Sequence, residues 1–159
     1  MIHLRKIDDD NIWKIVKLSV REDQKNFVAT NTQSLLQAYL ALANHEVALP
    51  FGIYDDETPV GFVMFGYGSS GDPDEPQITH GNYCIWRFMI DAAHQRRGFG
   101  RAALAACLDY LRGAPCGAAR FCWLSYEPEN TVAKALYESV GFRENGETCG
   151  EEIVSVLAL

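Results

Sequence analysis

The segment that most constrains the fold runs from an apolar stretch at residues 82–90 into a helix at residues 98–112. The apolar stretch lacks alternation, which is typical of a central strand covered on both faces. The helix carries its apolar side chains at helical spacing, in a stripe formed by Leu104, Cys107, Leu108 and Leu111. A buried strand followed by an amphipathic helix predicts an α/β arrangement, with helices packed on a sheet.

The remainder of the chain reads as further strands and helices in a single domain spanning residues 1–159. The other strands are expected at residues 2–6, 48–54, 60–67, 119–125 and 153–159. The other helices are expected at residues 10–23, 33–43 and 131–140, with Thr32 or Asn31 capping the second of these. Residues 68–77 are rich in glycine, proline and aspartate and predict a loop.

Composition excludes several classes of function. The formal net charge is −7, so a nucleic-acid-binding surface is not expected. The acidity attracts a cationic small molecule, or it serves solubility alone. No run is long enough to span a membrane and no export signal opens the chain. The five cysteines are odd in number and lack C-x-x-C spacing, which indicates reduced, mostly buried thiols, no metal site and a cytoplasmic protein.

The turn between the apolar strand and the helix has the composition of an anion site. We call residues 95–101, Gln-Arg-Arg-Gly-Phe-Gly-Arg, the glycine loop. Glycines let a ligand approach the backbone, and the free amides of a helix N-terminus attract negative charge. A pyrophosphate fits this pattern, although the same composition also describes an ordinary turn with surface arginines. The dinucleotide-binding fingerprint and the Walker phosphate loop are both absent.

Two blocks of sequence resemble the GNAT superfamily of N-acetyltransferases. In the first, Gln95, Gly98 and Gly100 follow a hydrophobic strand. In the second, Asn130 precedes a run containing Ala133, Tyr137, Gly141 and Phe142. The resemblance implies acetyl-CoA as cofactor and an α+β fold. That fold has a mixed, mostly antiparallel sheet flanked by helices, splayed between the strands at 82–90 and 119–125.

Longer strings resemble bacterial spermine/spermidine (diamine) acetyltransferases. These strings are residues 24–28, 86–91, 125–130 and 150–153. They imply an enzyme that transfers acetyl to a primary amine of a polyamine by direct attack in a ternary complex. The alternatives are another amine (a protein N-terminus, an amino acid or an aminoglycoside) and a non-catalytic module that binds acetyl-CoA. The resemblance also implies a homodimer.

The resemblance assigns cofactor contacts residue by residue. The backbone of Phe88, Met89 and Ile90 is expected to pair with the pantetheine arm, and Asn130 and Ala133 to contact the same region. The glycine loop is expected to hold the pyrophosphate through Gln95, Arg96, Arg97, Gly98, Phe99, Gly100 and Arg101.

Attack of an amine on a thioester requires a proton acceptor, a polarised carbonyl and a proton for the leaving thiolate. Tyr137 matches the family's acidic tyrosine and is expected to supply that proton. The backbone amide of Met89 or Ile90 is expected to polarise the carbonyl. No carboxylate lies between His80 and Ile90, where some polyamine acetyltransferases have a basic glutamate. Tyr83, Glu22, Glu127 or a water chain remain candidates for the proton acceptor.

A polycationic acceptor needs carboxylates and aromatic faces. The residues expected to bind it are Glu22, Trp86, Tyr126, Glu127 and Glu152. For the glutamates, an ordinary solvated surface is the competing interpretation. Arg87 argues against a uniformly acidic pocket unless it is paired elsewhere.

Overall fold

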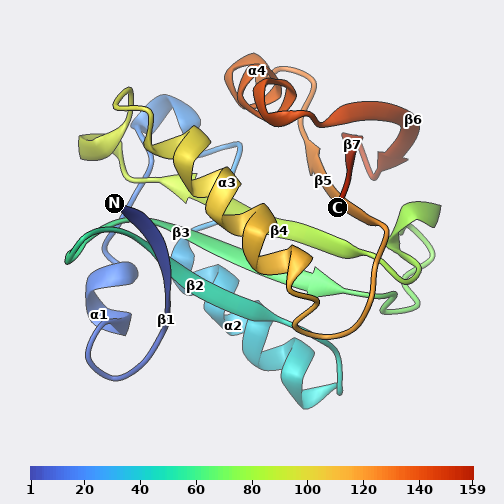
Figure 1. Cartoon of the computed structure of the whole chain (residues 1–159), viewed down its shortest axis with the longest axis horizontal. Helices are drawn as coiled ribbons and strands as arrows, with labels where there is room; N and C mark the ends of the chain where they lie inside the picture. The colour runs from blue at the N-terminus through green and yellow to red at the C-terminus, as the bar shows by residue number, and fades with distance from the viewer.

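The computed structural model describes residues 1–159 and shows a seven-stranded sheet flanked by helices (Figure 1). The strands are β1 (Ile2–Lys6), β2 (Leu49–Asp55), β3 (Thr58–Tyr67), β4 (Tyr83–Ile90), β5 (Phe121–Tyr126), β6 (Arg143–Cys149) and β7 (Glu152–Ala158). The α-helices are α1 (Ile12–Ile15), α2 (Asn31–Ala43), α3 (Phe99–Arg112) and α4 (Thr131–Val140). Short 3₁₀ turns occur at Glu22–Gln24, Gln77–Thr79 and Ala92–His94.

The sheet is mixed and mostly antiparallel, in the order β1-β2-β3-β4-β5-β7-β6. Only β4 and β5 are parallel neighbours, and they pair at just two positions, Tyr83 with Cys122 and Cys84 with Trp123. Beyond these pairs β4 continues to Ile90 and β5 to Tyr126, but the two strands no longer pair with each other. The sheet is therefore splayed at this point, which confirms the predicted fold and the predicted position of the splay.

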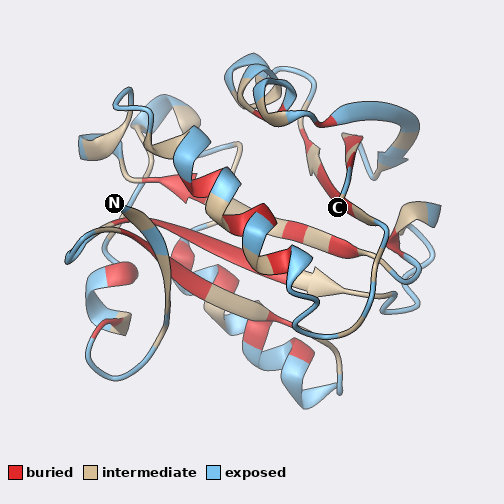
Figure 2. Ribbon diagram, viewed as in Figure 1, coloured by how far each residue is buried: buried red, intermediate tan, exposed pale blue.

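Helices cover both faces of the sheet, and a hydrophobic core lies under each pair (Figure 2). Helices α3 and α4 pack on one face, with the predicted α3 stripe of Leu104, Cys107, Leu108 and Leu111 buried. Helices α1 and α2 pack on the other face, over the smaller core. Strand β4 contributes to both cores, as its continuous apolar sequence predicts.

Strand β4 contains a bulge where it leaves its regular pairing with β3. Met64 pairs with Arg87 and Phe65 with Ile85, so Trp86 is an extra residue in β4. A bulge bends the strand and redirects the side chains next to it. Near the other end of β4, Gly61 of β3 lies so close that a Cβ atom there would overlap the Met89 carbonyl oxygen.

The predicted helix at residues 10–23 is wrong over most of its length, because tertiary hydrogen bonds replace the helical ones. The Ser19 amide would pair with the Ile15 carbonyl in a continuous helix. Instead, the Ser19 amide donates to Asp91 Oδ1 (2.9 Å), and the Ile15 carbonyl accepts from Asn31 Nδ2 (2.9 Å). Helix α1 thus ends at Ile15, and the chain runs on to the sheet edge beside residue 91.

Three smaller expectations also need correction. Helix α2 is capped by Thr30, whose hydroxyl accepts from the Gln33 amide, rather than by Asn31 or Thr32. Strand β6 was not predicted, because its sequence is polar and mostly exposed and has no apolar alternation. Among the five unpaired cysteines, Cys116 is exposed rather than buried.

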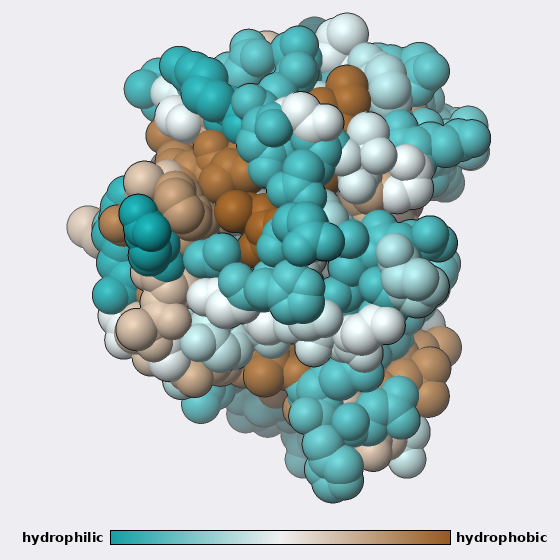
Figure 3. Space-filling view, turned by 90° about the vertical axis from the view of Figure 1, so that its right-hand side faces the viewer, coloured by the Kyte–Doolittle hydropathy of each residue, from teal (hydrophilic) through white to brown (hydrophobic).

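The surface is mostly hydrophilic. On the side shown in Figure 3, hydrophobic side chains gather in a hollow rimmed by hydrophilic ones. None of the helices combines the length and the apolar character that crossing a membrane requires.

The close contact at Gly61 generates a stability prediction. Gly61→Ala forces β3 away from β4 and is expected to lower the free energy of unfolding by about 1–3 kcal/mol. Gly66→Ala is the matched control on the same strand, because its added Cβ has no neighbour nearer than 3.8 Å. We expect Gly66→Ala to leave the free energy unchanged or raise it by about 0.5–1 kcal/mol. Urea denaturation of both variants checks this, and equal stability of the two would contradict it.

Candidate active site

A cavity of about 770 Å³ opens where β4 and β5 separate. Its walls come from the second half of β4, the glycine loop, the end of β5, the start of α4 and the segment at residues 20–29. Most of the predicted site residues line it, namely Trp86, Phe88, Met89, Ile90, Gln95, Arg96, Gly98, Gly100, Arg101, Tyr126, Glu127, Asn130, Ala133, Tyr137 and Glu152. The structure thus brings together residues separated by up to 66 positions in the sequence, the distance from Trp86 to Glu152.

The backbone of the glycine loop presents unpaired amides. The backbone amides of residues 97–101 have no hydrogen-bond partner within the protein, and the first paired one is Ala102, which donates to the Gly98 carbonyl (3.2 Å). Gly98 has a φ of +79°, and the space beside it is open. Arg96 also has a positive φ, of 62°. These consecutive free donors at the N-terminus of a 14-residue helix make a site for an anion.

Positive charge reinforces these amides. Arg96, Arg97 and Arg101 have no carboxylate within salt-bridge distance, whereas Arg5, Arg21 and Arg112 each have one. Arg96 and Arg101 line the cavity, whereas Arg97 and Phe99 do not. The loop therefore offers an uncompensated positive field to a multiply charged anion.

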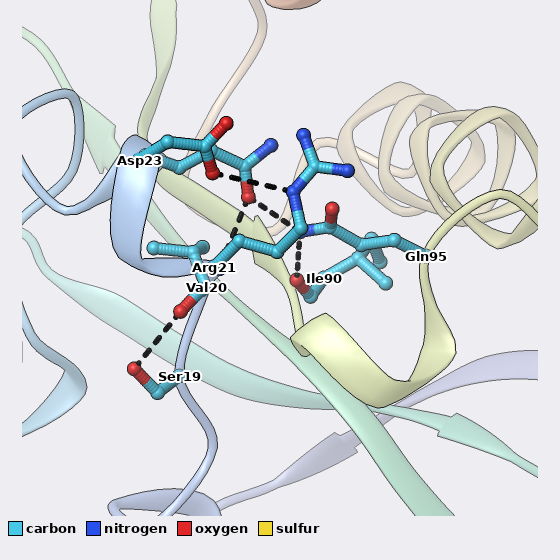
Figure 4. Close-up of polar contacts among 7 residues, drawn as sticks. Ser19, Val20, Arg21, Asp23, Ile90 and Gln95 are labelled. Carbon is cyan, nitrogen blue, oxygen red and sulfur yellow. Dashed lines mark hydrogen bonds and ion pairs between the residues drawn. The ribbon is translucent and has the colours of Figure 1, made fainter.

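The side chain of Gln95 ties the glycine loop to the opposite wall (Figure 4). Its Nε2 donates to the Ile90 carbonyl (3.0 Å) and to Gln24 Oε1 (2.8 Å). Gln24 Oε1 also accepts from the Arg21 amide (3.2 Å). One side chain thus fixes both the end of β4 and the beginning of the 20–29 segment.

Tyr137 lies at the base of the cavity, on α4. Its ring packs beside Phe88, Tyr126 and Phe142, and its hydroxyl has no hydrogen-bond partner in the protein. Burial, followed by the nearby charge of Glu152, raises the pKa of the Tyr137 hydroxyl above its usual value. The hydroxyl is therefore protonated at neutral pH and free to donate into the cavity.

Asn130 begins the helix that carries Tyr137. Its Oδ1 accepts from the Ala133 amide (3.3 Å), which caps α4. On the neighbouring helix, Gly100 allows close packing, because a Cβ there would lie 3.2 Å from Leu136. Gly100 thus lets α3 pack closely on α4 beside the cavity.

Glu127 and Glu152 are the only acidic residues that line the cavity. Tyr126 pairs with Ile153, so continuing the same register places Glu127 opposite Glu152. Ser125 Oγ donates to Glu152 Oε1 (2.8 Å), whereas the Glu127 side chain has no partner. Neither carboxylate has a basic group within salt-bridge distance, so the cavity contains two uncompensated negative charges.

Trp86 and Arg87 both line the cavity. The Arg87 guanidinium donates to Gln37 Oε1 (2.8 Å) and to the Trp86 carbonyl (3.0 Å), and it has no carboxylate partner. Burial lowers the pKa of Arg87, and the charge of Glu152 partly opposes this effect. Arg87 is therefore held by neutral groups, with its Nε buried and unpartnered.

Some predicted residues lie outside the cavity or are already occupied by other partners. The Glu22 side chain is 86% exposed, pairs with Lys25 (2.6 Å) and does not line the cavity. The Tyr126 hydroxyl is engaged with Glu144 and Ser155, each at 3.2 Å. Tyr83 is fully buried, and its hydroxyl donates to the Gly117 carbonyl and accepts from the Cys116 amide.

Sequence reasoning missed most of one wall. The segment at residues 20–29 lines the cavity with side chains that include Phe27 and Val28. Its one signal in the sequence was the string at residues 24–28, which matched the family without indicating a position. Gln37, the partner of Arg87, had no signal, because an isolated glutamine on a helix is ordinary.

Comparison with protein families matches residues 12–142 of this chain to a family described as "Acetyltransferase (GNAT) family". The chain is 30% identical over 146 residues to "Spermine/spermidine N(1)-acetyltransferase" of Bacillus subtilis, covering 92% of this chain and 90% of that protein. It is 32% identical over 106 residues to "N-alpha-acetyltransferase RimI" of Mycobacterium tuberculosis, covering 67% of this chain and 61% of that protein.

Solved structures share the fold at lower identity. An aminoglycoside acetyltransferase in complex with coenzyme A superposes with a TM-score of 0.78 at 19% identity, covering 99% of this chain and 95% of that chain. The PaiA N-acetyltransferase of Thermoplasma acidophilum, also with coenzyme A, has a TM-score of 0.67 at 14% identity and covers 100% of this chain and 99% of that chain.

The glycine loop generates a binding prediction. Alanine at position 98 has an unfavourable φ, which costs about 1–2 kcal/mol, and its Cβ enters the space beside the free amides. We expect Gly98→Ala to weaken coenzyme A binding by about 10-fold or more, measured by calorimetry. Gly68→Ala is the matched control, with a φ of +77° and equally open space but no place in the cavity. Both variants should lose similar stability, and similar coenzyme A affinities in the two would refute the assignment.

Proposed function

Because the chain belongs to the GNAT family of acetyltransferases and is an acetyl-CoA-dependent N-acetyltransferase, we propose that its acceptor is a polyamine such as spermine or spermidine. Transfer takes place by direct attack of a primary amine in a ternary complex. The homodimer that the sequence resemblance implies stays a prediction.

The geometry of the glycine loop supports its assignment to the cofactor's pyrophosphate. The free amides of residues 97–101, with Arg96 and Arg101 beside them, match a diphosphate in charge and in hydrogen-bonding need. Gln95 orients the loop, and Asn130 and Ala133 line the cavity next to it. When bound, acetyl-CoA supplies the activated acetyl group as a thioester.

The edge of β4 that faces the splay is assigned to the pantetheine arm. Amides along a strand alternate between its two edges. The Asp91 amide donates to the Val60 carbonyl of β3 (2.8 Å), so the alternation directs the Ile90 and Phe88 amides toward the splay. This favours Ile90 over Met89 as the donor that polarises the thioester carbonyl.

Tyr137 is assigned as the proton donor to the departing sulfur. Its hydroxyl has no competing partner and is protonated at neutral pH, as a phenol is. Because a thiol is more acidic than a phenol, the hydroxyl acts by donating a hydrogen bond to the sulfur as negative charge develops there, and the proton is passed on as the carbon–sulfur bond breaks.

The pair of unpaired carboxylates is the observation that carries the polyamine proposal. Glu127 and Glu152 lie at neighbouring register positions on the cavity wall, with Trp86 facing the same cavity. Two basic residues of the adjoining segment are neutralised, Arg21 by Asp23 (3.3 Å) and Lys25 by Glu22 (2.6 Å). An ammonium group would compensate the glutamates. The indole already has the Arg87 guanidinium 5.7 Å from its ring centroid, so a ligand cation would have to use its other face.

Arg87 favours a second candidate, an amine that also carries a carboxylate. Its half-buried guanidinium lines the cavity and is held only by neutral partners. A buried charge is usually compensated by an opposite one. An amino acid or a peptide N-terminus would provide both the amine and the anion.

Acceptor specificity tests the proposal directly. We expect spermine and spermidine to be acetylated with a kcat/KM at least about 10-fold above that of amino acids or aminoglycosides, equivalent to ~1.4 kcal/mol. A thiol-release assay at fixed acetyl-CoA, run over a panel of amines, measures this. Inert polyamines, together with turnover of an amino acid, would replace the first candidate by the second.

Removal of the Tyr137 hydroxyl tests its role. Tyr137→Phe is expected to lower kcat by about 10²–10⁴ while leaving the affinity for coenzyme A unchanged, because only proton donation is lost. Tyr110→Phe is the control, since Tyr110 packs on α3 between Phe51 and Phe65 and does not line the cavity. A Tyr137→Phe enzyme with wild-type kcat would eliminate the hydroxyl as proton donor.

A further inference from the structure

Strand β4 has no carboxylate that could accept the proton of the attacking amine. Positions 86 and 87 of β4 hold Trp and Arg, and no acidic residue lies between His80 and Ile90. Two other candidates are excluded by their surroundings. The Tyr83 hydroxyl is occupied by the Gly117 carbonyl and the Cys116 amide, and Glu22 lies outside the cavity, paired with Lys25.

Of the two carboxylates left in the cavity, Glu152 is the one held in place. Ser125 Oγ donates to its Oε1 (2.8 Å), and the residue is partly buried at the start of β7. This bond occupies Oε1 and leaves Oε2 without a hydrogen-bond partner. Glu127 follows the end of β5, and its side chain makes no hydrogen bond. A proton acceptor must be positioned, and only Glu152 meets that condition.

The charge of Glu152 affects groups on two elements that border the splay. After burial, its charge is the largest influence that raises the pKa of the Tyr137 hydroxyl on α4. The same charge opposes the lowering of the Arg87 pKa on β4. Glu152 lines the same cavity as Arg87 of β4 and Tyr137 of α4, which is the cavity where the amine and the thioester must meet.

We propose that Glu152 is a catalytic residue that accepts the proton of the attacking amine, and that Ser125 is its positioning residue. The amine nitrogen forms a bond to the acetyl carbon as the carbon–sulfur bond breaks. Glu152 takes one proton from that nitrogen, and Tyr137 gives one to the sulfur. Solvent then returns a proton from Glu152 to the Tyr137 phenolate, so the products are an amide and a thiol. The inference rests on acetyl transfer and not on the identity of the acceptor.

The pH dependence of kcat separates this role from a structural one. The charge of Glu152 influences the pKa of Arg87 and Cys84 on β4, of Cys149 on β6 and of Tyr137 on α4. Glu127 lies opposite it when the register of β5 and β7 is continued. Burial raises the pKa of both thiols, and arginine remains charged throughout the accessible range. Because His94 also lines the cavity, a fall in kcat toward acid pH is assigned to Glu152 only if Glu152→Gln displaces it.

The experiment compares Glu152→Gln with two other glutamine variants. Glu152→Gln is expected to lower kcat by about 10²–10⁴ and to displace the acid limb toward alkaline pH, where the residual rate follows the amount of free amine. Ser125→Ala is expected to lower kcat by about 2- to 10-fold and keep the limb, since the loss is that of one hydrogen bond. Glu151→Gln, exposed and outside the cavity, should retain wild-type kcat. Glu127→Gln should raise the KM of a polycation and keep the limb.

Two measurements keep the outcome decisive. Calorimetric affinity for coenzyme A and the melting temperature of Glu152→Gln should equal those of the wild type, which shows an intact donor site and fold. The kinetics are run on spermidine and also on hydroxylamine, a small neutral amine that needs no polyamine site. Inert spermidine with active hydroxylamine would reject the polyamine proposal alone. A Glu152→Gln enzyme that keeps both its kcat and its acid limb on the reactive amine, or a Glu127→Gln enzyme that loses them instead, would overturn the assignment of Glu152.

Discussion

The separation of β4 from β5 is the constraint on which the rest of this molecule depends. Two residue pairs hold these strands together, and beyond them the sheet has no continuous ladder. Each strand then presents an unpaired edge, which would be unfavourable if buried without a partner. Here the unpaired edges border a cavity, so the backbone amides and carbonyls that strand pairing would occupy remain available to a ligand. The bulge at Trp86 increases the bend of β4 at this point and turns Trp86 and Arg87 toward α2.

The cavity is lined by both positive and negative side chains, which the net charge of −7 for the whole chain does not show. Arg96 and Arg101 lie at the glycine loop, whereas Glu127 follows the end of β5 and Glu152 starts β7, with Arg87 of β4 as a further unpaired charge in the cavity. An anionic donor and a cationic acceptor would therefore enter fields of opposite sign within one cavity. Tyr137 lies between these two regions, in surroundings apolar enough to keep its hydroxyl neutral.

The sequence was most informative where chemistry requires a particular backbone. Gly98 and Gly100 indicated the anion loop, because each position tolerates no larger residue without strain or a clash. The stripe of α3 and the continuous apolar run of β4 indicated two elements of the core. The helix expected at residues 10–23 failed, because local periodicity contains no information about Asp91, 72 positions beyond Ser19. Glu152 was among the residues expected to bind the acceptor, but only the register with β5 shows that it, and not the adjacent Glu151, lines the cavity.

The wall at residues 25–29 is anchored at both ends by hydrogen bonds to distant parts of the chain. On one side Gln24 is bound to Gln95, and on the other Asn31 is bound to the Ile15 carbonyl. Between these anchors, five residues face the cavity without belonging to a helix or strand. The hydrogen bonds that anchor this wall come from Gln24 and Asn31, outside the five residues, so the shape of this side of the cavity can change through those five side chains without loss of either anchor.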